Sequence, residues 1–160
     1  MIVVADSSPL HYLLLLDHID LLHRFYRQVA VPDAVARELS SGSAPPVVRE
    51  WIAQPPSWVD VVPVAPDAIH AVTDDLDAGE RAAIALATAL GADLLLIDEA
   101  AGRSEARRRH LRVTGTLGVL RVGAEQGLVN VPEMIARLRT TSFYVDDALL
   151  NAVFGHWLDL

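Results

Sequence analysis

The chain has 160 residues, of which 52% are apolar, and its mean hydropathy is +0.30. A chain of this length and composition can bury a sizeable core, which excludes a disordered protein. It contains no cysteine and no lysine. Disulfides, thiolate catalysis, lysine Schiff bases and the phosphate-binding P-loop are therefore excluded. No apolar run approaches the roughly 20 residues of a membrane helix, and the first residues, MIVVADSSP, do not resemble a signal peptide.

The formal net charge of −8 argues against general binding to nucleic acid, which needs a cationic surface. All thirteen cationic side chains are arginines, however, and five of them lie between Arg103 and Arg112. Part of the acidic excess can also be offset by a bound metal if the acids gather in one place. Because the chain lacks cysteine, we expect it in a reducing cytoplasm.

Short apolar runs alternate with helical patterns along the chain, which is typical of parallel β-α units. The expected strands are Ile2–Ala5, Gln28–Val31, Val59–Val64, Leu94–Ile97, a short strand at Val113, and Leu128–Val131. Fully apolar strands such as Leu94–Ile97 are typical of a sheet that is covered on both faces. We predict a three-layer α/β/α sandwich with a central, mostly parallel sheet, built by one domain over residues 1–160.

Several helix boundaries are marked by capping residues. Ser8 followed by Pro9 predicts a helix start, and so does Pro32 after a strand. Thr116 is expected to cap a helix that ends at Gly127.

Two further segments carry a structural expectation. Residues 41–58 contain four prolines, which predicts a connection with a short helix inside it. Near the C-terminus, Leu149, Val153 and Trp157 repeat at helical spacing. We expect this apolar stripe to dock a terminal helix on the core.

Two aspartates directly follow expected strands. Asp6 comes after the first strand, and Asp98 comes after Leu94–Ile97. In open parallel sheets, ligands bind beyond the carboxyl ends of the strands, so these side chains should share one edge. Capping of the following helices is the alternative role for both residues, although Ser8 already supplies a cap beside Asp6.

Glu80 lies at the start of a helical pattern in which Glu80, Ile84 and Ala87 share one face. This face should pack on the sheet. Asp77 and Glu80 also have the spacing of a capping box, so a capping role and a metal-binding role are equally compatible with this spacing. Asp77 remains the alternative to Glu80 as an acid of the site.

Glu38 flanks the apolar stripe of the helical segment VPDAVARELS, where a glutamate is most often exposed. The chemistry makes the four acids more informative together than singly. Mg²⁺ prefers oxygen ligands and retains several waters, so a few converging carboxylates suffice to hold it. Nuclease sites use such ions to activate water and to stabilise the leaving oxygen.

These residues lie in segments that resemble the PIN-domain nucleases, especially a bacterial and archaeal branch regarded as toxins of toxin–antitoxin pairs. The matching segments are VVADSSPL, VPDAVARELS, LDAGERAAIALA, ADLLLIDEAAGR, and VTGTLGVL followed by GLV. They cover the first ~130 residues in the family's order. The C-terminal segment beyond about Val131 matches no functional motif.

The resemblance implies cleavage of single-stranded RNA by water activated at Mg²⁺ or Mn²⁺. It assigns the acids of the site to Asp6, Glu38, Glu80 and Asp98. The wider family often has aspartate where this chain has the longer Glu80. Secondary positions implied by the resemblance are Ser7, Glu99 and Thr116.

Among the arginines, Arg103 follows Asp98 on the same expected helix and is placed to contact a substrate phosphate. The six histidines show no HxxxH or HExxH spacing, which argues against a histidine-based metal site.

The predicted function is a metal-dependent endoribonuclease, with a small antitoxin protein as partner and a homodimer as a further expectation from the family. The main alternative is a non-catalytic PIN-like protein that binds a partner protein or RNA. A phosphotransferase that uses Asp6 as nucleophile would call for a second aspartate at position 8, which is serine.

Overall fold

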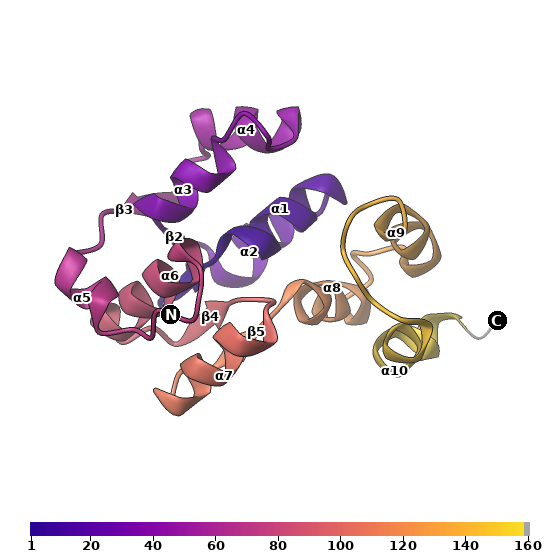
Figure 1. The fold of residues 1–160 in the computed structure, drawn as a ribbon. Helices are drawn as coiled ribbons and strands as arrows, with labels where there is room; N and C mark the ends of the chain where they lie inside the picture. The colour runs from indigo at the N-terminus through magenta and orange to yellow at the C-terminus, as the bar shows by residue number, and fades with distance from the viewer. Residues whose placement is uncertain (159–160) are drawn as a thin grey trace.

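A computed structural model describes residues 1–158 and contains a five-stranded parallel sheet (Figure 1). The strand order is β3-β2-β1-β4-β5. The strands are β1 (Val3–Ala5), β2 (Val29–Pro32), β3 (Val59–Val62), β4 (Leu94–Leu96) and β5 (Val113–Thr114). The central strand β1 is paired on both sides, with Val4 opposite Ala30 of β2 and Leu95 of β4.

Ten helices are present in the described part of the chain, and they connect and follow the strands. They are α1 (Ser7–Leu15), α2 (Asp20–Tyr26), α3 (Asp33–Leu39), α4 (Pro46–Ala53), α5 (Pro66–His70), α6 (Ala78–Leu90), α7 (Ala100–Arg108), α8 (Thr116–Glu125), α9 (Val131–Leu138) and α10 (Asp147–Leu158). The short helix expected within residues 41–58 is confirmed as α4.

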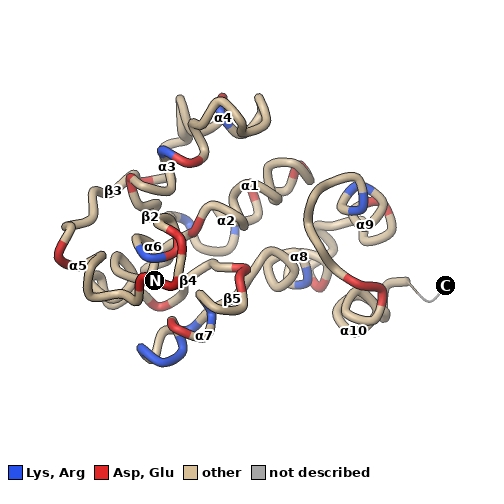
Figure 2. Tube along the Cα trace, viewed as in Figure 1, with Lys and Arg blue, Asp and Glu red and all other residues tan. Residues whose placement is uncertain are grey.

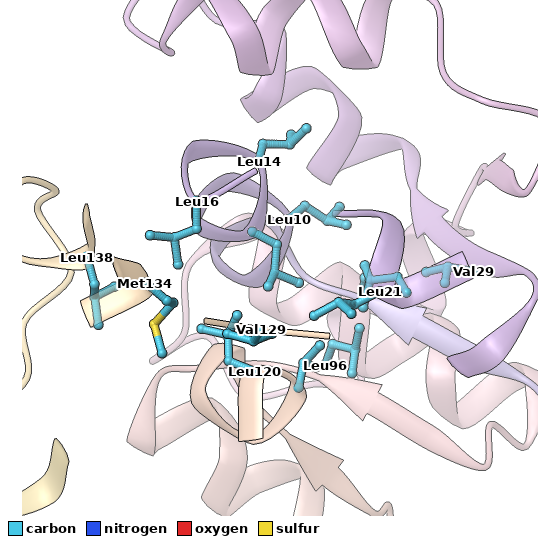
Figure 3. Close-up of a cluster of buried hydrophobic side chains, with 14 of the residues drawn as sticks. Leu10, Leu14, Leu16, Leu21, Val29, Leu96, Leu120, Val129, Met134 and Leu138 are labelled. Atoms are coloured by element: carbon cyan, nitrogen blue, oxygen red, sulfur yellow. The ribbon is translucent and has the colours of Figure 1, made fainter. Parts of the chain in front are cut away.

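Helices cover both faces of the sheet, as the apolar strands predict. Successive residues of β1 point to opposite faces. Val3 and Ala5 belong to a large core with α1, α2, α3, α4, α8, α9 and α10, whereas Val4 belongs to a second core with α6 and α7. Figure 3 shows the large core extending from Val29 and Leu96 of the sheet through Leu120 of α8. The predicted three-layer α/β/α architecture is therefore confirmed.

Five of the expected strands are confirmed, β1, β3 and β4 with shorter bounds and β2 shifted by one residue, but the strand expected at Leu128–Val131 is wrong. Val131 is the first residue of α9. The side chain of Asn130 accepts a hydrogen bond of 3.1 Å from the backbone N–H of Glu133 and so caps this helix. Pro132 in the first turn also favours a helix start over a strand.

Three of the expected helix starts are displaced. The cap position of α1 is Asp6 rather than Ser8, and that of α8 is Gly115 rather than Thr116. Pro32 ends β2 and precedes α3 instead of occupying its first turn. The hydroxyls of Ser8 and Thr116 are instead hydrogen-bonded to Asp98.

The terminal helix α10 docks on the core, as expected, but with a different stripe. Leu150 and Phe154 are buried, whereas Val153 and Trp157 are only partly buried and Leu149 is exposed. The apolar residues of α10 cover two adjacent stripes, and packing against α8 and α9 selects the stripe one residue further along. In Figure 1, α9 and α10 lie together at the end of the molecule opposite α5.

No helix of residues 1–158 is long and apolar enough to cross a membrane.

Candidate functional site

The strand order reverses at β1, which has β2 on one side and β4 on the other. Asp6 follows the carboxyl end of β1, and Asp98 comes two residues after β4. The backbone N–H of Asp6 donates to the carbonyl of Leu96 at 2.9 Å, which joins the ends of the two strands. Both aspartates therefore lie at the crevice where open parallel sheets bind ligands.

Asp6 is a buried carboxylate with only partial hydrogen-bond compensation. The residue is only 3% exposed. Its Oδ1 is buried and has no hydrogen-bond partner among the described residues. The pKa of Asp6 is raised to about 7, mainly by burial and also by the charges of Asp77, Glu38 and Asp98, against an opposing effect of the Ser7 backbone hydrogen bond. Burial of an ionisable group without a partner is the pattern found at functional sites.

Glu80 is a second buried acid, in the first turn of α6. Burial is the main cause that raises the pKa of Glu80 to about 8, followed by the charge of Asp77, a hydrogen bond with Asp77, and the charges of Asp6 and Glu99. The side chain of Asp77 accepts a bond of 2.8 Å from the Glu80 backbone N–H, so Asp77 is the helix cap. The capping role that this spacing allowed therefore belongs to Asp77. Glu80 is buried, whereas Asp77 is exposed.

Asp98 is half-buried and fixed by three hydrogen bonds. Its Oδ1 accepts from the backbone N–H of Thr116 at 2.7 Å. Its Oδ2 accepts from the Thr116 hydroxyl at 2.7 Å and the Ser8 hydroxyl at 2.8 Å. Asp98 does not cap α7, whose cap position is Glu99. The hydroxyls expected to cap α1 and α8 instead orient this carboxylate.

Thr116, a secondary site position implied by the resemblance, is fully buried. Ser8 was expected only as a helix cap, and the sequence offers no local signal for its bond to Asp98, 90 residues away.

Glu38 lies on the exposed side of α3, but its carboxylate approaches the first turn of α6. A Cβ placed on Gly79 would overlap the carboxylate of Glu38. Glycine at position 79 thus leaves the space that Glu38 occupies. Ser7 lies beside it in a pocket of about 250 Å³ that Ser8, His11 and Glu38 also line.

We call the six carboxylates whose charges act on Asp6 and Glu80, these two included, the acidic cluster. Its members are Asp6, Glu38, Asp77, Glu80, Asp98 and Glu99. Within residues 1–158, no three Asp, Glu or His side chains are arranged to enclose one metal ion as they stand. The acids share an electrostatic neighbourhood, and joint coordination of an ion would need side-chain movement.

Arg103 lies beside the cluster on α7. A Cβ placed on Gly115 would be 2.5 Å from Oδ1 of Asp98 and 3.5 Å from a terminal nitrogen of Arg103, so both side chains meet at this glycine. The other arginines of the sequence cluster extend to the far end of α7 (Figure 2). Arg108 and Arg109 pair there with Glu105.

A second cavity, which we call the Arg103 pocket, adjoins Asp98 and has a volume of about 340 Å³. Phe143 and Tyr144, from the segment between α9 and α10, form part of its wall together with Leu149. The sequence motifs did not point to these residues. An aromatic pair in an otherwise polar connection is the signal that would have done so.

Fold and site together define a class: α/β/α proteins with a carboxylate cluster at the switch point of a parallel sheet. A family model described as a PIN domain matches residues 2–157, and the chain belongs to this family. PIN domains are commonly nucleases and typically use divalent metals, which indicates a hydrolase in general terms. No curated protein matches the chain.

Proposed function

We propose that the protein is a metal-dependent endoribonuclease that cleaves single-stranded RNA at the acidic cluster. The observation that carries the proposal is Asp6: a buried carboxylate with a free oxygen, at the switch point of the sheet, with three other acids raising its pKa. Burial and the neighbouring acids disfavour the ionised form of Asp6, and a bound cation would stabilise that form. Membership of a nuclease family makes a divalent metal the best candidate.

The residues present fit Mg²⁺ or Mn²⁺. The donor set consists of carboxylates, and hard cations prefer oxygen ligands. Asp6 and Asp98 would be the principal ligands, with Glu80 and Glu38 completing the site directly or through water. A bound ion would activate water for attack and stabilise charge on the scissile phosphate and leaving oxygen.

The chain's own residues contribute orientation and electrostatics. Thr116 and Ser8 hold the Asp98 carboxylate in one position, so Asp98 itself would need little reorganisation when a ligand binds. Asp77 caps α6 and thereby fixes the turn that carries Glu80. Arg103 offers a positive charge next to Asp98 for the substrate phosphate.

The direct test is incubation of the purified protein with a labelled single-stranded RNA. We expect cleavage with Mg²⁺ or Mn²⁺, loss of cleavage in EDTA, and recovery when the metal is restored. A protein that binds the RNA but leaves it intact in every metal condition would instead be the non-catalytic, RNA-binding alternative.

A substitution at Gly79 tests the place of Glu38 in the site. Gly79→Ala should displace the Glu38 carboxylate, because the added Cβ overlaps it. Misplacement of a catalytic group by about 1 Å can cost up to a hundredfold in rate, so we expect cleavage to fall by about tenfold or more. Stability should not fall, because alanine is favoured over glycine in a helix by about 0.5–1 kcal/mol.

Gly155→Ala is the matched control, since the same change in α10 meets no atom within 4 Å. Melting curves and cleavage rates of both variants separate the two effects. If Gly79→Ala cleaves RNA as fast as Gly155→Ala, Glu38 has no part in the site.

The biological role proposed from the resemblance is that of a toxin, acting in the cytoplasm and inhibited by a small antitoxin protein, with a homodimer as its expected form. Expression of the wild type should arrest growth, and Asp98→Asn should not. Growth should recover when a small neighbouring gene product is co-expressed. Normal growth with active wild-type enzyme would exclude the toxin role while leaving the nuclease activity in place.

A further inference from the structure

The Arg103 pocket adjoins the acidic cluster and is lined by two distant parts of the chain. Asp98 and Gly115 follow β4 and β5, and Arg103 lies on the intervening helix α7. Phe143 and Tyr144 come from the connection between α9 and α10. Its volume of about 340 Å³ lies in the range of small-molecule sites, roughly 300–1,000 Å³. Because Asp98 belongs to both, a ligand in the pocket is adjacent to the cluster.

Arg103 supplies an available cation in this pocket. Its side chain is half-buried, and among the residues that the structure describes it forms no ion pair. Arg108 and Arg109, on the same helix, are both paired with Glu105. A guanidinium with free donors is suited to bidentate contact with a phosphate.

Tyr144 supplies an aromatic surface at the rim. The residue is 92% exposed, although the segment that carries it is anchored. The neighbouring Phe143 packs edge-on against Tyr12 of α1 with ring centroids 4.9 Å apart. The Tyr12 hydroxyl is also hydrogen-bonded to the Ser142 hydroxyl at 2.8 Å. The backbone at Tyr144 is thus anchored beside the pocket, and the exposed ring is available to a ligand.

We propose that the Arg103 pocket is a nucleotide subsite for the RNA strand next to the scissile phosphate, in which Arg103 contacts a phosphate and Tyr144 stacks on a base. This inference rests on the proposed function, and assigns part of residues 131–158 to substrate binding. Exposed tyrosines stack on bases in single-stranded nucleic acid without strong sequence preference. The subsite should therefore increase the affinity for single-stranded RNA and orient the strand, without selecting particular bases.

The two contacts predict different salt signatures, measured by the binding of a fluorescent single-stranded RNA in EDTA, where no cleavage occurs. Tyr144→Leu should weaken binding about 5- to 150-fold at every salt concentration, the equivalent of 1–3 kcal/mol for one stacked base. Tyr144→Phe should bind like the wild type. Arg103→Ala should lower the slope of log affinity against log salt by about 0.7, the value for one phosphate contact to a single strand.

Arg107→Ala is the matched control for charge, because this exposed arginine lies on the same helix and outside the pocket. It should leave the slope close to that of the wild type. Unchanged melting curves are expected for the Tyr144 variants, since the side chain is exposed. Equal binding by Tyr144→Leu and Tyr144→Phe, or equal slopes for Arg103→Ala and Arg107→Ala, would overturn the subsite.

Cleavage separates the failure of this inference from that of the proposed function. If the wild type cleaves RNA with metal but the four variants bind like the wild type, only the subsite is wrong. If the variants show the expected pattern but the wild type never cleaves, the pocket is an RNA-binding site and the nuclease assignment is wrong.

Discussion

Asp98→Asn is expected to lower the rate of metal-dependent RNA cleavage by roughly two to three orders of magnitude. The variant removes a negative charge from the proposed metal site and changes almost no volume. Loss of charge stabilisation at a metal centre amounts to several kcal/mol in the transition state, and about 1.4 kcal/mol corresponds to a tenfold change in rate.

The surroundings of Asp98 explain why the variant should still fold. The amide oxygen of asparagine can accept from the Thr116 N–H, as Oδ1 of Asp98 does. The hydroxyls of Ser8 and Thr116 can rotate to accept from the new amide N–H groups. Circular dichroism should therefore match the wild type.

Asp60→Asn is the matched control, because it removes the same charge from an exposed position on β3. Identical preparation of the three proteins also reveals any contaminating ribonuclease, whose activity would appear in all of them. Cleavage by Asp98→Asn at the rate of Asp60→Asn would remove Asp98 from the site.

The sheet was predictable because its signal is local. Runs such as Leu94–Ile97 are apolar throughout, and a parallel sheet covered on both faces is the environment that tolerates them. The rule that ligands bind at the carboxyl edge then directed attention to Asp6 and Asp98 without any contact information. The one false strand, Leu128–Val131, was a short apolar run in which Asn130 and a following proline outweigh β propensity.

The hydrogen bonds around Asp98 were not predictable, because they join residues far apart in the chain. Ser8 and Thr116 have the local pattern of helix caps, and only the assembled fold brings their hydroxyls to a carboxylate. The pocket wall at Tyr144 has the same origin. Its position depends on how α9 and α10 dock on the core. Because α10 has two adjacent apolar stripes, the periodicity of its sequence does not determine which stripe is buried.

Asp6→Asn is expected to stabilise the metal-free protein at neutral and alkaline pH. Burial holds the folded-state pKa of Asp6 near 7, compared with an ordinary value of 3.8. The protonated carboxyl is therefore favoured in the folded protein. The protonated carboxyl of Asp6 contributes fully to the free energy of unfolding below about pH 4, and this contribution is lost as the pH rises through about 7.

The size of the effect follows from the separation of the two pKa values. Each pH unit of separation corresponds to about 1.4 kcal/mol, which gives an upper limit of about 4 kcal/mol at pH 8. Relaxation of the site reduces this figure, so we expect Asp6→Asn to be more stable by about 2 kcal/mol in EDTA. For a chain of this size that is a rise of about 4–8 °C in melting temperature. At about pH 4 the difference should be small, because both the folded and the unfolded protein then hold much of the proton.

Metal should reverse this order. Wild type gains the free energy of metal binding, about 2.7 kcal/mol at a hundredfold excess over Kd, whereas Asp6→Asn loses most of it. Asp98→Asn provides the contrast, because Asp98 already accepts three hydrogen bonds and has little strain to relieve. It should melt at or below the wild type in EDTA at pH 8. If Asp6→Asn also melts below the wild type there, and Mg²⁺ raises all three melting temperatures equally, Asp6 is a structural carboxylate and the acidic cluster does not bind metal.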